Sequence, residues 1–175
     1  MWALAVQIGF VAAGVAAAGG EHSTAQGMTS LLVTPARGRL AVARLVVLAG
    51  TGLVFASVLV GASLAACPTT STAALWAGGR TVVWLTAALL LAAGLGEALR
   101  SVIGAATVAV VLVILAPQLA MFAGDIARWL PGQAAQIWMA AAAPQTDVTA
   151  AGLAALGWTT AAQAAGITRL LRADA

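Results

Sequence analysis

The chain has 175 residues, of which 62% are hydrophobic and only 7% are charged. A soluble domain usually carries about 25% charged residues, so this composition excludes a protein whose whole surface faces water. The eight basic residues, all arginine, form no cluster with interleaved aromatic residues, which excludes a nucleic-acid interface. Cys67 is the single cysteine, so an intrachain disulfide is excluded as well. The length and composition predict one integral membrane domain over residues 1–175.

Long apolar stretches recur along the whole chain. A membrane-spanning helix needs about 20 mostly apolar residues, and none of these stretches shows the alternating pattern of a membrane β-strand. The sequence therefore predicts an all-α integral membrane protein with about five transmembrane helices. Their predicted ranges are 2–19, 40–66, 81–97 (with a start a few residues earlier), 102–123 and 148–168.

The arginines set the predicted orientation, because short cytoplasmic loops carry an excess of Lys and Arg. Placing the loop at 21–39 in the cytoplasm puts six arginines inside and leaves only Arg80 and Arg128 outside. This choice predicts an N-terminus outside the cell and a C-terminus in the cytoplasm. The six arginines on the inner side are Arg37, Arg39, Arg44, Arg100, Arg169 and Arg172.

The predicted spans contain no ionisable residue away from their ends. Ionisable groups inside a membrane mark proton relays and ion-coupled sites, so the pattern argues against a proton-coupled transporter or a pump. Three uncharged polar residues, Gln7, Gln118 and Gln163, could line a substrate path or hold helices together. Pro117 is expected to bend the fourth span and free a carbonyl, for which Gln118 is one candidate partner.

The polar stretch "GEHSTAQGMTSLLVTPARGR" interrupts the apolar pattern after the first span. One interpretation is an ordinary cytoplasmic loop whose arginines hold the next helix in place. The other is a docking element for a soluble partner, since residues 28–35 combine leucines with hydroxyl side chains. Glu97 and Arg100 lie three residues apart at the predicted turn between the third and fourth spans, where they could pair on one helix face.

Three stretches in order resemble one family. Glu21 followed by "LLVTPARGRLAVARL" is similar to the region after the second helix of ABC-2 type transporter permeases, the transmembrane subunits of type V ABC exporters. Residues 89–120 resemble two helices of that family joined by a tight turn, and residues 127–138 resemble its extracellular hairpin. The positions that match the first motif are Glu21, Gly27, Thr29, Leu31, Leu32, Thr34, Pro35, Arg37, Arg39 and Arg44.

The resemblance implies a coupling helix that docks on a separate ABC ATPase subunit. Its residues would be Gln26, Gly27, Met28, Thr29, Ser30, Leu31, Leu32, Val33 and Thr34. The cytoplasmic interface around it would include Glu21, Arg37, Arg39, Arg44, Glu97 and Arg100. The resemblance also implies an extracellular helical hairpin over 125–138, before the last span.

The same resemblance implies a permease subunit in a bacterial inner membrane, paired with a second permease subunit as a homodimer or heterodimer. The chain has no G-x-x-x-x-G-K-[ST] phosphate loop, so ATP and Mg would bind the partner ATPase. We expect no cofactor, metal or catalytic residue on this chain, and hence no enzyme activity of its own. The exported substrate is expected to be hydrophobic or amphipathic, because the predicted spans carry no internal charge.

The chain departs from the family at its front. The family has six helices and a cytoplasmic N-terminus, whereas five helices are predicted here and the family's first helix is missing. A short gene, a late start or a second polypeptide would each account for it. The alternative function is a non-transporting, permease-like scaffold or accessory subunit that stabilises a partner. A membrane-embedded enzyme is disfavoured, because the sequence shows no paired carboxylates, HExxH or Ser/His constellation.

The predicted orientation can be tested with single cysteines at Ser71 and Ser30 in a Cys67→Ala background. An impermeant thiol reagent applied to intact cells should label position 71, on the outer side, and spare position 30, on the inner side. Labelling of position 30 without labelling of position 71 would invert the topology.

Overall fold

The computed structural model describes residues 2–23, 37–67, 71–140 and 145–172, and in these ranges every regular element is a helix. The prediction of an all-α chain is therefore confirmed for the described residues. The elements are α1 (Trp2–Ser23), α3 (Arg37–Ala65), α4 (Thr72–Leu99), α5 (Val102–Ala109), the π-helical η1 (Val110–Leu115), α6 (Ala116–Ala123), the 3-10 helix η2 (Gly124–Trp129), α7 (Pro131–Met139) and α8 (Gln145–Arg172).

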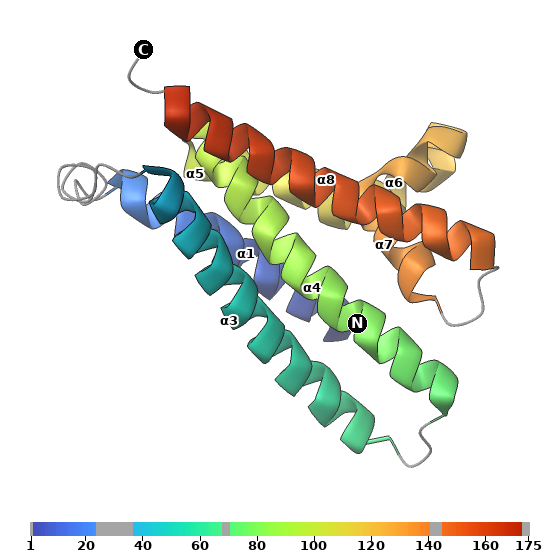
Figure 1. Cartoon of the computed structure of the whole chain (residues 1–175). Helices are drawn as coiled ribbons and strands as arrows, with labels where there is room; N and C mark the ends of the chain where they lie inside the picture. The colour runs from blue at the N-terminus through green and yellow to red at the C-terminus, as the bar shows by residue number, and fades with distance from the viewer. Residues whose placement is uncertain (1, 24–36, 68–70, 141–144, 173–175) are drawn as a thin grey trace.

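Helix α4 lies in the middle of the bundle, with α1, α3 and α8 along its sides (Figure 1). Helix α1 runs parallel to α4, because Gly14 lies against Leu89 and Ala18 lies against Gly96. Helix α3 runs antiparallel to α4, since Gly78 lies against Val60 while Arg44, near the opposite end of α3, reaches Glu97. Successive long helices thus reverse direction, as crossings of a membrane would require.

Two helices are long and apolar enough to cross a membrane, by length and composition. These are the stretches Gly38–Ala65 of α3 and Thr72–Leu99 of α4. Shorter apolar stretches occupy Leu4–Gly19 of α1 and Val102–Gln118 of α5, η1 and α6. Helix α8 covers the fifth predicted range, so a helical stretch occurs at each of the five predicted places.

Helix α4 begins at Thr72, earlier than the start near Thr81 that the apolar pattern indicated. The side chain of Ser71 accepts a hydrogen bond from the Ala74 amide and caps the helix. Arg80 is accommodated because its guanidinium donates to the carbonyl oxygen of Trp138, at 3.3 Å. Arg80 therefore lies within α4, and its charged guanidinium is hydrogen-bonded to a backbone carbonyl of α7.

The turn between α4 and α5 is tight. Arg100 follows the last residue of α4 in the left-handed conformation, with φ of 51°, and its amide donates to the Gly96 carbonyl. Ser101 then caps α5 by accepting from the Gly104 amide at 3.1 Å. The chain thereby reverses with both flanking helix ends hydrogen-bonded.

Glycines let the helix backbones approach one another closely. A Cβ atom added at Gly14 would lie 2.2 Å from the Leu89 carbonyl oxygen, and one at Gly94 would lie 2.7 Å from the Ala162 carbonyl carbon. A Cβ at Gly96 would lie 2.3 Å from that of Ala18. Because lipid removes most of the hydrophobic drive between helices, such close backbone packing is a main source of helix association in membranes.

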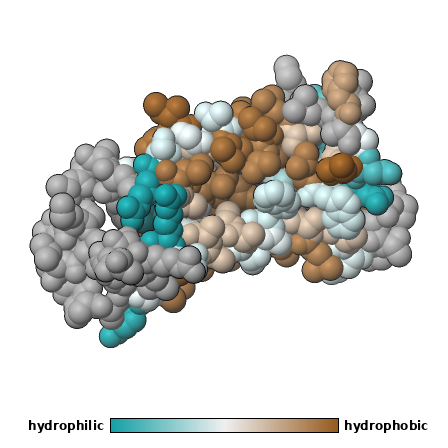
Figure 2. Space-filling model, turned by 90° about the horizontal axis from the view of Figure 1, so that it is seen from above, coloured by the Kyte–Doolittle hydropathy of each residue, from teal (hydrophilic) through white to brown (hydrophobic). Residues whose placement is uncertain are grey.

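The outer surface of the bundle is strongly apolar. Only 17% of the most apolar stretch of α3 is buried. Val47 and Val58 of this helix are 65% and 64% exposed. Hydrophobic residues cover the middle of the face drawn in Figure 2, and hydrophilic residues gather towards its two ends. Water would strongly disfavour such a surface, whereas lipid would not.

The segment before the last long helix forms the predicted pair of short helices, η2 and α7, separated at Leu130. The pair is fixed to α8, because the indole of Trp158 donates to the Trp129 carbonyl oxygen at 2.9 Å. Trp158, itself partly exposed, therefore holds this hairpin on α8.

Two glycines of α4 provide a matched stability test. Gly94→Ala should lower the free energy of unfolding by about 1–3 kcal/mol, because the added methyl group cannot fit against the backbone of α8. Gly79→Ala, on the exposed side of the same helix with nothing within 4 Å, should be neutral or slightly stabilising. Unfolding by SDS in mixed micelles measures both, and equal effects would contradict the close contact of α4 with α8.

Candidate functional site

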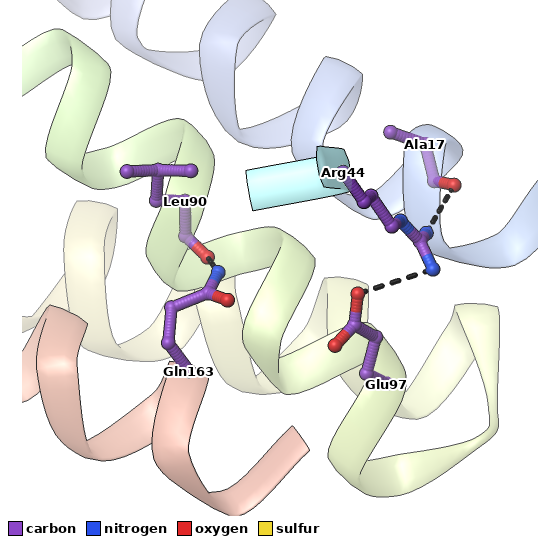
Figure 3. A network of polar contacts seen from close by, with 5 residues as sticks. All are labelled: Ala17, Arg44, Leu90, Glu97 and Gln163. Carbon is purple, nitrogen blue, oxygen red and sulfur yellow. Dashed lines mark hydrogen bonds and ion pairs between the residues drawn. The ribbon is translucent and has the colours of Figure 1, made fainter. Parts of the chain in front are cut away.

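An ion pair joins three helices at one end of the bundle. Nη1 of Arg44, on α3, lies 3.1 Å from Oε1 of Glu97, on α4. Nη2 of the same guanidinium donates to the Ala17 carbonyl oxygen of α1 at 2.7 Å (Figure 3). The two side chains are 20% and 17% exposed, so solvent screens the pair only partly. We call Arg44, Glu97 and the Ala17 carbonyl the inner node.

Helix α8 reaches the inner node as well. A Cβ at Gly166 would lie 2.8 Å from Oε2 of Glu97, so the carboxylate rests directly against the α8 backbone. One turn further along α8, the guanidinium of Arg169 donates to the Ala98 carbonyl oxygen. Four helices are therefore held together within two turns of the end of α4.

The node lies near the ends of two helices that are consecutive in the described chain. Helix α1 ends at Ser23 and α3 begins at Arg37, so the node ties together the two helices that residues 24–36 connect. Arg44 lies about two turns after the start of α3, and Ala17 about two turns before the end of α1. The node is therefore a polar contact to α4 close to the connecting segment, beside the packing of α1 and α3 along α4.

The predicted cytoplasmic interface is only partly gathered at the node. Arg44 and Glu97 are in contact, whereas Arg39 and Arg100 are exposed. The partner found for Glu97 is Arg44, because α4 ends at Leu99 and Arg100 has already left the helix. Glu21 falls in α1 and Arg37 begins α3, but their side chains lie outside what the structure describes, as does the whole predicted coupling helix, 26–34.

Gln163 joins α8 to α4 inside the bundle. Its Nε2 donates to the Leu90 carbonyl oxygen at 2.5 Å, and the side chain is 9% exposed. One turn earlier on α8, the hydroxyl of Thr159 lies 3.4 Å from the Ala87 carbonyl oxygen and 3.1 Å from that of Ala155. The bonds to Leu90 and Ala87 join α8 to α4, and holding helices together is one of the two roles expected for the glutamines.

Gln7 and Gln118 occupy different surroundings. Nε2 of Gln7 lies 3.5 Å from the carbonyl oxygen of Val113 in η1. Pro117 has no N–H, so this carbonyl lacks the donor that a regular α-helix would supply. The Val113 carbonyl therefore lies near the side chain of Gln7 in α1, whereas the side chain of Gln118 is exposed. A substrate path along the three glutamines stays a prediction.

Several residues of these contacts were not singled out by their sequence context. Thr159 and Gly166 lie in an Ala-rich stretch where many residues look alike, although their spacing of seven does place them on one helix face. Trp84 is fully buried at the centre of the bundle, and an apolar run gives no sign of which aromatic residue lies inside. Among the described residues there is no cluster of three His, Cys, Asp or Glu side chains that could hold a metal ion.

No family model matches the chain, and comparisons with curated proteins and with solved structures gave no match.

The inner node predicts a stability effect of single substitutions. Glu97→Gln should lower the free energy of unfolding by about 1.5–3 kcal/mol, because it removes the charged acceptor from a partly buried guanidinium. Arg39→Gln, which changes an exposed arginine near the start of the same helix α3, serves as the control and should change stability by less than about 0.5 kcal/mol. Similar losses for both variants, measured in mixed micelles, would contradict the node.

Proposed function

We propose that this chain is the transmembrane permease subunit of an ABC exporter. It crosses a bacterial inner membrane five times, with its N-terminus outside and its C-terminus in the cytoplasm. A separate subunit binds and hydrolyses ATP with Mg, and a second permease subunit completes the membrane part. The family resemblance of the sequence motifs motivates this proposal, and the alternating directions of the long helices are compatible with five crossings.

The inner node is the observation that carries the proposal. A permease driven by a separate ATPase must pass motion from a cytoplasmic docking element to its spans. In this chain the docking element is residues 26–34, between α1 and α3, and the node joins those two helices to α4. The contacts of Gly166 and Arg169 extend the same connection to α8. Motion of the docking element therefore has a short physical route to four helices.

The interior favours an uncharged or amphipathic substrate. The buried hydrophobic residues in the described part are alanines, valines, leucines, Phe10 and Trp84. The buried polar side chains, Thr159 and Gln163, bond to backbone carbonyls. A permanently charged substrate would find no compensating charge among these groups. We place the path at the contact between two permease subunits, where lipid-like molecules could enter from the bilayer.

The alternative is a permease-like scaffold that stabilises a partner without transporting anything. The exposure of α3 favours it, because a single helix with a broad apolar face can pack against another membrane protein. The two functions differ in a measurable way. A scaffold forms its complex without stimulated ATP hydrolysis, whereas a permease subunit raises hydrolysis by its partner.

Replacing both Leu31 and Leu32 by Asp tests the docking role. Buried in the groove of an ATPase, the new charges would weaken binding by about 3–5 kcal/mol, so the ATPase should no longer co-purify and Mg-ATP hydrolysis of the preparation should fall at least tenfold. The control carries the same two charges beside the element, as Ala25→Asp with Ala36→Asp, and should retain the complex.

An intact complex with full ATP hydrolysis in the Leu31/Leu32 variant would contradict the docking role. A complex of the unchanged chain that hydrolyses no ATP above the level of the isolated ATPase would instead support the scaffold.

A further inference from the structure

The fourth helical stretch is interrupted near its middle. Residues Val110–Leu115 form a π-helical segment, in which the Ala116 amide donates to the Val111 carbonyl oxygen. Pro117 follows directly and leaves the Val113 carbonyl without its usual helical donor. π segments and prolines are the places where helices bend, and π segments occur frequently at functional sites. The backbone hydrogen bonding along α5, η1 and α6 is therefore interrupted at this stretch.

Two side-chain donors lie at the depth of the Val113 carbonyl. Nε2 of Gln7 is 3.5 Å away, at the long limit of a hydrogen bond. Trp84 is 0% exposed, and its indole N–H has no acceptor in the described part of the chain. Such a buried, unpaired donor is rare in folded proteins.

The parallel packing of α1 on α4 fixes the depth of these two donors. Gly14 lies against Leu89 and Ala92. Because both helices rise equally per residue, Gln7, about two turns before Gly14, lies opposite the turn of α4 that holds Trp84. Trp84 and Val113 also belong to the same buried cluster. The acceptor that Pro117 frees and the donor without a partner are therefore neighbours in depth.

The start of α7 packs against the same Val113 carbonyl. A Cβ at Gly132 would lie 2.3 Å from the Val113 oxygen and 2.9 Å from the Leu112 oxygen. Pro131, the first residue of α7, is fully buried beside it. The start of α7 thus packs against the π segment, and because Trp158 holds η2 on α8, a bend at η1 would move α6 most directly.

We propose that η1 is a two-position joint in which the Val113 carbonyl exchanges its donor between Gln7 and Trp84. In the position seen here Gln7 holds the carbonyl weakly and the Trp84 N–H is unpaired. In the second position Trp84 donates to the carbonyl, and α6 changes its angle to α5 while η2 and α7 stay held on α8. Close-packed cores move between discrete arrangements instead of deforming continuously. The joint goes beyond the proposed function and does not depend on an ATPase.

Spin labels test the joint in the full chain in lipid nanodiscs. With Cys67→Ala, labels at Val58 on α3 and Phe122 on α6 occupy exposed positions, and their distance should show two populations. Trp84→Phe keeps the ring but removes the donor, so only the present distance should remain. Gln7→Leu should enrich the other distance. Trp76→Phe, at an exposed tryptophan of the same helix, is the matched control and should keep both.

The indole N–H resonance of Trp84 gives a second, independent readout in ¹⁵N-tryptophan-labelled protein. It should move downfield in Gln7→Leu, as the donor gains its acceptor. Pro117→Ala restores the backbone donor to Val113 and should leave one narrow distance. A single wild-type distance that none of these variants changes would overturn the joint. If Trp84→Phe does not fold, an unshifted indole resonance in Gln7→Leu overturns it equally.

Discussion

The ion pair between Arg44 and Glu97 determines how α1, α3, α4 and α8 meet at one end of the bundle. A chain with so few charges cannot leave one of them unpaired near hydrocarbon, because the ionised group would lose its hydration without compensation. The guanidinium of Arg44 is compensated by an ion pair with the Glu97 carboxylate and a hydrogen bond to the Ala17 carbonyl. Since these acceptors belong to two other helices, satisfying one charge fixes the positions of α1 and α4 relative to α3.

Away from this end, contact between the helices depends on shape and on single hydrogen bonds. Gly14, Gly94 and Gly96 bring backbones together, and Thr159 and Gln163 bond across α8 and α4. Such contacts are stiff, because a glycine against a carbonyl has no side chain that could adjust. Motion delivered at the node would thus be passed along α4 with little loss. The π segment before Pro117 interrupts the regular α-helical hydrogen bonding, and the start of α7 packs against it.

The sequence was sufficient to predict where helices occur, because length and apolar composition are local properties. The family resemblance of residues 127–138 also predicted the two short helices before α8. The sequence failed where a partner comes from a distant part of the chain. Arg80 could be placed inside α4 only by knowing that the Trp138 carbonyl lies within reach. The freed carbonyl of Val113 met Gln7, more than a hundred residues away, instead of the adjacent Gln118. Local spacing likewise suggested Arg100 as the partner of Glu97, because it carries no information about α3.

The coupling energy between Arg44 and Glu97 tests the account most directly. A double-mutant cycle with Arg44→Gln, Glu97→Gln and the combination of both measures it, by SDS unfolding in mixed micelles. The account predicts a coupling of at least about 1 kcal/mol, because the second substitution removes a partner that is already lost. Additive effects, with a coupling below about 0.3 kcal/mol, would show that the two side chains do not hold the helices together. The proposed route from residues 24–36 to the bundle would then lack its physical basis.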